Sequence, residues 1–376
     1  MKQNFKKFYL GQIDLIMKYF EYLNEKKEFY DDLLEFIEDD SDSENNSLYN
    51  QLNYFKKKEN QQEAILFFRL LAQLSNDHHR QPNFFKKIEQ ILQFFSTYIK
   101  QTFSNFTQFK IFKKSKLIIL FLIEHDIMIV DKKIVKLMID RSLKTNTKYH
   151  HFFYPEIKQY LESQDINKIE EEIQEKDMKE FKRLRKIGEN ESFLCNLIRN
   201  DLIVDFISLY SRNVLILQST IIPSLYETNS FLINKEISIM EYACFFGSVQ
   251  IIRFLLLNNI QFQPQDWLFA IHSNNAELIH ILEENHVMPP YGTFNICFDE
   301  AIKCHNNEIA HYIKDVLMNS EYMNYKQILK YYNYDQIPDE FNDNSIFYNL
   351  CRYNYTTLVD LYLKPKRESL TDISKV

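Results

Sequence analysis

The sequence predicts an all-α protein in which an N-terminal helical region precedes a solenoid of short helix pairs. Three observations predict this fold class. Apolar residues recur at helical spacing along most of the 376 residues, strand patterns are scarce, and four stretches of the second half repeat one pattern. Short extended pieces are expected only at Val214–Leu217 and at Ile221–Ile222, where Ser, Thr and Pro surround brief apolar runs.

The first half contains several helical patterns separated by polar breaks. Beyond residues 1–40, helices are expected at Gln61–Leu74, Pro82–Lys100, Phe106–His125, Lys132–Leu143 and from Pro155 onward. Glu38–Asn46 is an acidic break and is predicted to be a solvated loop, with phosphorylation of Ser41 or Ser43 as the alternative reading. From Asp165 to Glu191, acidic residues precede basic ones, which favours an exposed helix joining the two halves.

The repeat is clearest between Ile239 and Ile260. A shift of 27 residues superposes it on Asp266–Val287, so that Ala243 matches Ala270. A third copy centres on Ala301, a fourth runs from Phe347 to Leu363, and a short upstream copy from Phe193 to Ile207 has Cys195 in the alanine position. The small residue lets neighbouring helices approach closely. Gly247 and Asn274, four residues after the alanines, suit the left-handed turn that ends each first helix.

Ser238–Ile260 resembles an ankyrin repeat. The likeness rests on a turn-forming Ser238, an apolar Met240, the small Ala243 and the helix-ending Gly247. Glu241 stands where that family has a histidine, and the alanine positions recur after 27, 31 and 49 residues rather than the family's period of about 33. The resemblance implies shortened hairpins, longer insertions, and a concave surface that binds another protein.

A wider resemblance covers most of the chain. It rests on His78–Leu92, Ile99–Phe109, Phe153–Lys158, Arg185–Asp201 and Glu227–Leu232. These segments are similar to an expanded protozoan family, of trichomonad type, in which a helical region without an assigned role precedes degenerate ankyrin repeats. The resemblance implies no catalytic residues. The expected organisation is an N-terminal helical domain (1–190), degenerate repeats (191–365) and a flexible tail (366–376).

The residues that carry chemistry elsewhere form no recognisable motif here. Four glycines cannot build a phosphate-binding loop. Cys297, Cys304, His305 and His311 have the wrong spacing for a zinc site on a helix, and the adjacent pairs His78–His79 and His150–His151 point in different directions. A distant Cys/His pair remains open, but nothing selects one cysteine. We therefore expect no cofactor, no metal and no enzymatic activity.

The composition limits the classes of partner that the protein is expected to bind. The net charge of −7 without a basic face argues against nucleic acid, and the longest apolar run, Leu117–Ile123, is too short to span a membrane. Five cysteines without CxxC spacing are expected to be reduced packing residues in a cytoplasmic or nuclear protein. Trp267 matches Met240 in the repeat and is expected in the core.

The favoured function is non-catalytic protein binding by a monomeric scaffold. On the repeat register, the exposed first-helix positions are predicted to contact the partner: Phe245, Phe246, His272, Ser273, Lys303, Cys304, Arg352 and Tyr353. Two alternatives stay open. One is a self-assembling or cytoskeleton-tethering structural protein, and the other is an enzyme with a site in the N-terminal region that includes His78, His79 or His150.

Overall fold

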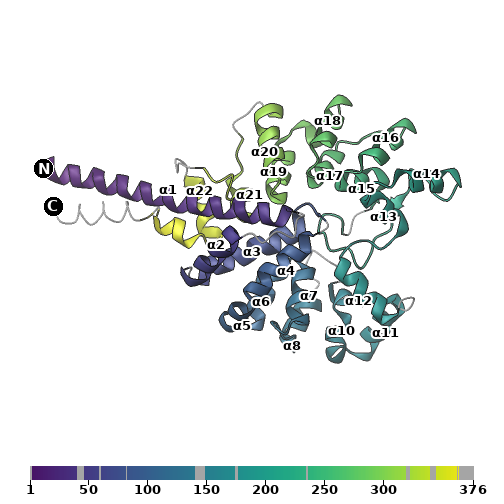
Figure 1. The fold of residues 1–376 in the computed structure, drawn as a ribbon, viewed down its shortest axis with the longest axis horizontal. Helices are drawn as coiled ribbons and strands as arrows, with labels where there is room; N and C mark the ends of the chain where they lie inside the picture. The colour runs from purple at the N-terminus through teal and green to yellow at the C-terminus, as the bar shows by residue number, and fades with distance from the viewer. Residues whose placement is uncertain are drawn as a thin grey trace. The chain divides into compact units, whose positions relative to one another are not determined.

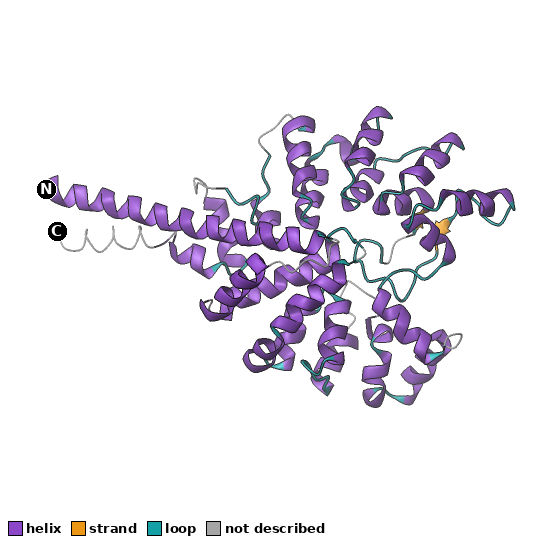
Figure 2. Ribbon diagram, in the orientation of Figure 1, coloured by secondary structure: helices purple, strands orange, loops and turns teal. Residues whose placement is uncertain are grey.

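The computed structural model describes residues 2–39, 46–58, 61–81, 83–139, 149–173, 177–233, 236–318, 322–338, 344–361 and 363. In these residues the secondary structure is helical apart from one short two-stranded ladder, which confirms the all-α prediction (Figure 2). No described helix combines the length and the apolar character needed to cross a bilayer. Ser41, Ser43 and the predicted tail lie outside the described residues.

The chain divides into two compact units, each assembled from more than one segment of the sequence. Unit 1 comprises Met1–Leu70, Gln81–Ile88 and Glu321–Val376, and unit 2 comprises Leu71–Arg80 and Glu89–Ser320. This division differs from the predicted boundaries at residues 190 and 365, because the C-terminal segment belongs to the same unit as the first helices.

Unit 1 joins the two ends of the sequence. Its helices are α1 (Lys2–Glu38), α2 (Asn46–Lys58), most of α3 (Gln61–Asp77), the start of α4 (Phe84–Phe94), α21 (Tyr325–Lys330) and α22 (Asn344–Arg352). The Tyr19 hydroxyl donates to the Pro338 carbonyl at 3.2 Å, and the Thr357 hydroxyl donates to Glu63 Oε1 at 2.5 Å. These bonds hold the C-terminal segment against α1 and α3.

The fourth repeat copy has the local geometry that the register predicts. Leu350, in the alanine position of α22, is fully buried, and its carbonyl accepts the amide of Tyr355 at 3.0 Å. Asn354, four residues after Leu350, has a φ of 62°. The helix therefore ends in a left-handed turn without glycine.

The first part of unit 2 is a set of short helices. They are the remainders of α3 and α4, α5 (Ser96–Thr102), α6 (Asn105–Phe112), α7 (Lys116–Glu124), α8 (Lys132–Ile139), α9 (Tyr149–Phe152), α10 (Tyr154–Ile157), the 3₁₀ turn η1 (Lys158–Tyr160), α11 (Ser163–Ile173) and α12 (Met178–Ile187). The single helix expected at Phe106–His125 is two helices, because the Ser115 side chain accepts the amide of Ile118 and starts a new one.

The second part of unit 2 is a row of four helix pairs (Figure 1). The pairs are α13 (Phe193–Arg199) with α14 (Ile203–Ser211), α15 (Ile239–Phe246) with α16 (Val249–Leu257), α17 (Asp266–His272) with α18 (Ala276–Glu284), and α19 (Asn295–Cys304) with α20 (Asn307–Tyr312). The remaining elements are β1 (Thr220–Ile221), β2 (Ile237–Ser238), the 3₁₀ turn η2 (Pro290–Gly292) and the π-helical turn η3 (Ile313–Leu317). The first helices contact one another in chain order, α13 with α15, α15 with α17, and α17 with α19.

The alanines that define the repeat lie where these first helices meet. Ala243, Ala270 and Ala301 are all fully buried, in α15, α17 and α19 respectively. Trp267 is buried as expected, and its Nε1 donates to the Val287 carbonyl at 2.8 Å. The extended piece expected at Ile221 pairs with Ile237 in the β1–β2 ladder, whereas Val214–Leu217 forms no strand.

The helix ends correct the register of the upstream copy. The carbonyls of Ala243 and Ala301 accept the amide five residues later, and the residue four positions on has a positive φ. In α13 the residue with this bond and this turn is Leu197, whose carbonyl accepts the amide of Leu202 while Asp201 has a φ of 47°. The alanine position is therefore Leu197, and assigning it to Cys195 was wrong by two residues.

Side chains also connect successive pairs. The Ser248 hydroxyl donates to the Ile198 carbonyl of the preceding pair at 2.5 Å, and Asn306 Nδ2 donates to the Ile271 carbonyl at 2.5 Å. The Asp201 carboxylate accepts the amides of Gln250 and Ile251, both at 3.0 Å, and so caps α16 of the next pair. Each joint thus combines apolar packing with bonds from the residue that starts the second helix.

Candidate functional site

The predicted partner-binding residues are mostly not on the surface. Phe245 is 5% exposed, His272 1% and Cys304 0%, so the prediction that these three side chains are exposed is wrong. Phe246, Ser273 and Lys303 are partly buried. Arg352 is exposed and Tyr353 half-buried, and both lie in unit 1 rather than in the row of helix pairs.

The physical reason is that the chain covers this face of the row with its own residues. The segment Tyr226–Leu232, which lies in the long insertion between α14 and α15, is buried apart from a half-buried Ser230. We call Tyr226–Leu232 the covering segment. Its Phe231 ring lies 4.8 Å from the Phe269 ring and 4.2 Å from the His272 ring, measured between centroids. The C-terminal end of α3 joins the cover, since His78 Nδ1 lies 2.7 Å from the Cys304 carbonyl oxygen.

The covering segment contains no helix or strand, and side chains accept the hydrogen bonds of several of its backbone amides. Glu227 Oε1 accepts the amides of Thr228 and Asn229 at 2.9 Å, and Asn229 Oδ1 accepts the amide of Phe231 at 2.8 Å. The Thr228 hydroxyl donates to the Gly188 carbonyl at 2.7 Å. Gly188 has a φ of 71°, and a Cβ there would lie 2.8 Å from the Leu117 side chain. A glycine is therefore required where the two loops meet.

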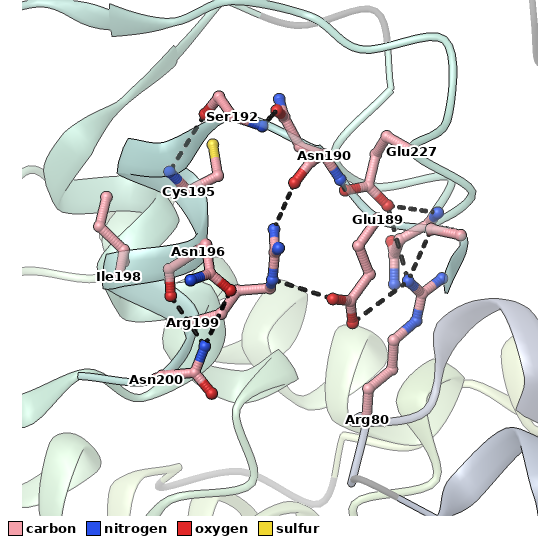
Figure 3. Close-up of polar contacts among 12 residues, drawn as sticks. Arg80, Glu189, Asn190, Ser192, Cys195, Asn196, Ile198, Arg199, Asn200 and Glu227 are labelled. Carbon is pink, nitrogen blue, oxygen red and sulfur yellow. Dashed lines mark hydrogen bonds and ion pairs between the residues drawn. The ribbon is translucent and has the colours of Figure 1, made fainter. Parts of the chain in front are cut away.

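A group of two arginines and two glutamates, each with a side chain at most 22% exposed, anchors these loops (Figure 3). Arg80 Nη1 lies 3.7 Å from Glu227 Oε1 and 4.0 Å from Glu189 Oε1, and Arg199 Nε lies 2.9 Å from Glu189 Oε2. Arg199 also donates to the Asn190 carbonyl at 2.7 Å. Burial raises the pKa of Glu227, and the Arg80 guanidinium opposes that shift. The four charges balance, which is the condition under which buried ions are tolerated.

These four residues come from three segments that are distant from one another in the sequence. Arg80 belongs to His78–Leu92, Glu189 and Arg199 to Arg185–Asp201, and Glu227 to Glu227–Leu232. A fourth segment, Phe153–Lys158, contributes Glu156, whose Oε2 lies 2.7 Å from Nη1 of the fully buried Arg185.

One cluster in unit 2 has the geometry of a nucleophile and a base. Cys304 Sγ lies 3.3 Å from His272 Nδ1, and His272 Nε2 lies 2.8 Å from Glu300 Oε1. Burial raises the pKa of the Cys304 thiol far above its usual value and lowers the pKa of His272, so that neutral forms are favoured. Because both side chains are closed to solvent, this cluster cannot receive a substrate as it stands.

The same cluster is poorly suited to a metal ion. Its three potential ligands, His272, Glu300 and Cys304, lie within reach of one ion. Lys303 Nζ, however, lies 2.6 Å from Glu300 Oε1, the oxygen that also contacts His272. Burial would raise the pKa of Glu300, but Lys303 and His272 hold it well below its usual range. A cation is thus already paired with the carboxylate. Sequence reasoning missed the cluster because His272 and Cys304 come from different pairs.

The metal and enzyme candidates considered from sequence differ in the structure. The ring centroids of His78 and His79 lie 4.3 Å apart, as do those of His150 and His151, so the prediction that these pairs point in different directions is wrong. Cys297, Cys304, His305 and His311 form no ligand cluster among the described residues. Two cavities each lie within one unit. One, of about 270 Å³, is lined by Gln93, Ser96, Thr97, Lys100, Gln101, His125 and Ile127, and another, of about 310 Å³, lies between α1 and α2. Neither of these two is lined by His78, His79 or His150.

Several large apolar side chains of unit 2 are exposed, and some of them lie on α14. Val204 is 78% exposed and Ile207 37%, whereas Phe206 is the one buried residue of this helix. Val204, Ile207, Ser208 and Ser211 fall on one side of a helix by their spacing, and we call them the α14 face. Leu202, Val214 and Ile216, directly before and after the helix, are 42%, 70% and 68% exposed.

The other side of α14 is occupied by its neighbour in the row. The Phe206 and Tyr210 rings both make edge contacts with Phe254 of α16. Figure 1 shows α14 at the end of the series α14, α16 and α18 within unit 2. The α14 face is therefore the outer surface of the first helix pair.

Comparison with family models, with curated proteins and with solved structures found no match.

Proposed function

We propose that the chain is a non-catalytic protein-binding scaffold built from degenerate ankyrin-like repeats. The row α13–α20 supports this reading, since four consecutive helix pairs meet through buried small or apolar residues at equivalent positions. Stacks of this kind bind other proteins through surfaces that extend over several repeats.

The observation that carries the proposal is the exposure of two apolar side chains, Val204 and Ile207, on the α14 face. Contiguous apolar surface on a water-soluble protein marks an interaction site, and terminal repeats normally turn a polar side outward. Here the outer helix of the first pair exposes Val204 and Ile207, with Val214 and Ile216 beside it in sequence. The first-helix face, where the repeat register predicts the partner, is filled by the covering segment. We therefore move the partner surface from that face to α14.

Four of the five cysteines, Cys195, Cys244, Cys297 and Cys304, are buried free thiols, whereas Cys351 is exposed, contrary to the expectation that all five pack inside. Free thiols support the further proposal that the protein works in a reducing compartment, the cytoplasm or the nucleus.

Proximity labelling in the native cell tests the function. Three forms of the full chain are compared: wild type, Val204→Glu with Ile207→Glu, and a control in which the 83% exposed Leu257 of α16 becomes Glu. We expect the double variant to lose labelled proteins that the wild type and the control retain. An identical labelled set from all three forms would show that α14 is not the partner surface.

A further inference from the structure

We propose that the α14 face binds the same face of a second copy of this chain. The inference rests on the proposed function and names its partner. It also replaces the monomer expected from sequence.

The apolar residues of α14 suit another helix. Val204, Ile207, Ser208 and Ser211 are spaced as i, i+3, i+4 and i+7, which is the stripe that packs against a neighbouring helix. Ser208 and Ser211 are small, so the backbones of two such helices can approach closely. The interior side of the same helix already packs against α16 in this way, through Phe206 and Tyr210.

The charges at the edge of the α14 face select a second copy over an unrelated helix. Asp205 and Arg212 are seven residues apart, so they lie on the same edge of the helix, two turns from each other. Both are exposed, and neither forms an ion pair with another described residue. When two α14 helices lie antiparallel about a two-fold axis, Asp205 of each copy comes within reach of Arg212 of the other. The surface is thus complementary to itself, as an isologous interface requires.

The size of the face sets the expected affinity. A standard interface buries about 800 Å² on each partner. The α14 face comprises four residues of one nine-residue helix, whereas a standard interface has about 20–30 residues a side. We therefore expect a reversible dimer with a dissociation constant on the order of 10 micromolar.

Sedimentation equilibrium of the full chain between about 1 and 200 micromolar measures the association. The wild type is expected to shift from monomer to dimer across this range. Val204→Glu with Ile207→Glu should stay monomeric, because association would bury four carboxylates in the two copies. The Leu257→Glu control should dimerise as the wild type does. Trp267 fluorescence and circular dichroism confirm that each variant is folded.

Charge exchange tests the antiparallel geometry. Asp205→Arg alone and Arg212→Asp alone should each weaken self-association roughly tenfold, since each places like charges at both of the symmetry-related 205–212 contacts. A heterodimer of the two variants has opposite charges at both 205–212 contacts. This heterodimer should be about as tight as the wild-type dimer, measured by fluorescence anisotropy with one variant labelled.

The outcomes separate this inference from the proposed function. If the wild type remains monomeric at 200 micromolar, the proposal that a second copy binds the α14 face is wrong. In that case, loss of labelled proteins from the α14 double variant in the cell would still support α14 as a protein-binding surface. The contact through α14 is rejected if the variant with glutamate at positions 204 and 207 still dimerises. It is also rejected if the two charge variants bind each other no more tightly than each binds itself.

Discussion

Truncation of Phe231 to alanine tests whether the covering segment holds unit 2 together. Phe231 is 8% exposed, and its ring contacts Phe269 edge-on and lies over His272, with Lys303 Nζ 5.3 Å from its centroid. Replacing a buried phenylalanine by alanine costs about 3–5 kcal/mol. The covering segment is a loop that can partly collapse into the space, so we expect a loss near the lower limit, about 3 kcal/mol.

Urea unfolding followed by Trp267 fluorescence is the appropriate assay. Trp267 is the only tryptophan and is buried in α17, so its emission reports on unit 2. A double-mutant cycle with Phe269→Ala isolates the ring contact, which should contribute about 1 kcal/mol of coupling. Phe193→Ala is the matched control, because Phe193 is 61% exposed and its truncation should cost less than about 0.5 kcal/mol.

A stabilising role for the covering segment is refuted if Phe231→Ala unfolds at the wild-type urea concentration. It is also refuted if the cost matches that of Phe193→Ala, since the covering segment would then contribute no more than a surface residue. A large cost with zero coupling to Phe269 would reject the ring contact alone.

Three further predictions concern single buried residues of unit 2. Burial lowers the pKa of Lys116 from 10.5 to about 7, so wild-type stability should rise with pH between about 7 and 10.5, where only the unfolded chain holds the proton. Lys116→Met should abolish this dependence on pH and stabilise the protein at pH 7 by on the order of 2 kcal/mol. Urea unfolding at pH 7 and at pH 9.5 measures both effects. Burial raises the pKa of Asp266 from 3.8 to about 7, so stability should fall as pH rises through that interval. The Asp266→Asn variant should be more stable than wild type by about 1–2 kcal/mol at pH 8 and equally stable near pH 4. The same difference in stability at both pH values would contradict the pKa shift. Ala270→Leu should overpack the contact between α17 and its neighbours and cost about 1–3 kcal/mol, and an unchanged urea midpoint would reject the repeat register.

Local signals in the sequence predicted the helix pairs well. Two local requirements explain the residues that define the pairs. Close packing of the first helices requires the small residues Ala243, Ala270 and Ala301, and the left-handed turn that ends a first helix favours Gly247 and Asn274. The upstream copy was misplaced by two residues because Cys195 and Leu197 are both buried, and small size alone favoured the cysteine. Only the backbone bond to Leu202 distinguishes them.

The covering segment was beyond sequence reasoning for a different reason. Glu227, Thr228 and Asn229 are polar and have the composition of a solvated loop. They are buried because Arg80 and Gly188, which are distant in the sequence, satisfy their charges and hydrogen bonds. The contact between His272 and Cys304 could not be predicted for the same reason, since the two residues are far apart in the sequence. The predicted binding residues were therefore assigned to a face that other residues of the chain cover.

The anchoring of Glu227 by Arg80 also limits how this protein can be divided for experiments. A fragment beginning after residue 235 would retain α15 to α20 but would lack Phe231, whose ring lies against Phe269 and His272. Such a piece should precipitate or recruit chaperones, and any protein it captured would report on an artificial sticky surface. Fragments intended for binding studies should therefore keep residues 71–318 intact.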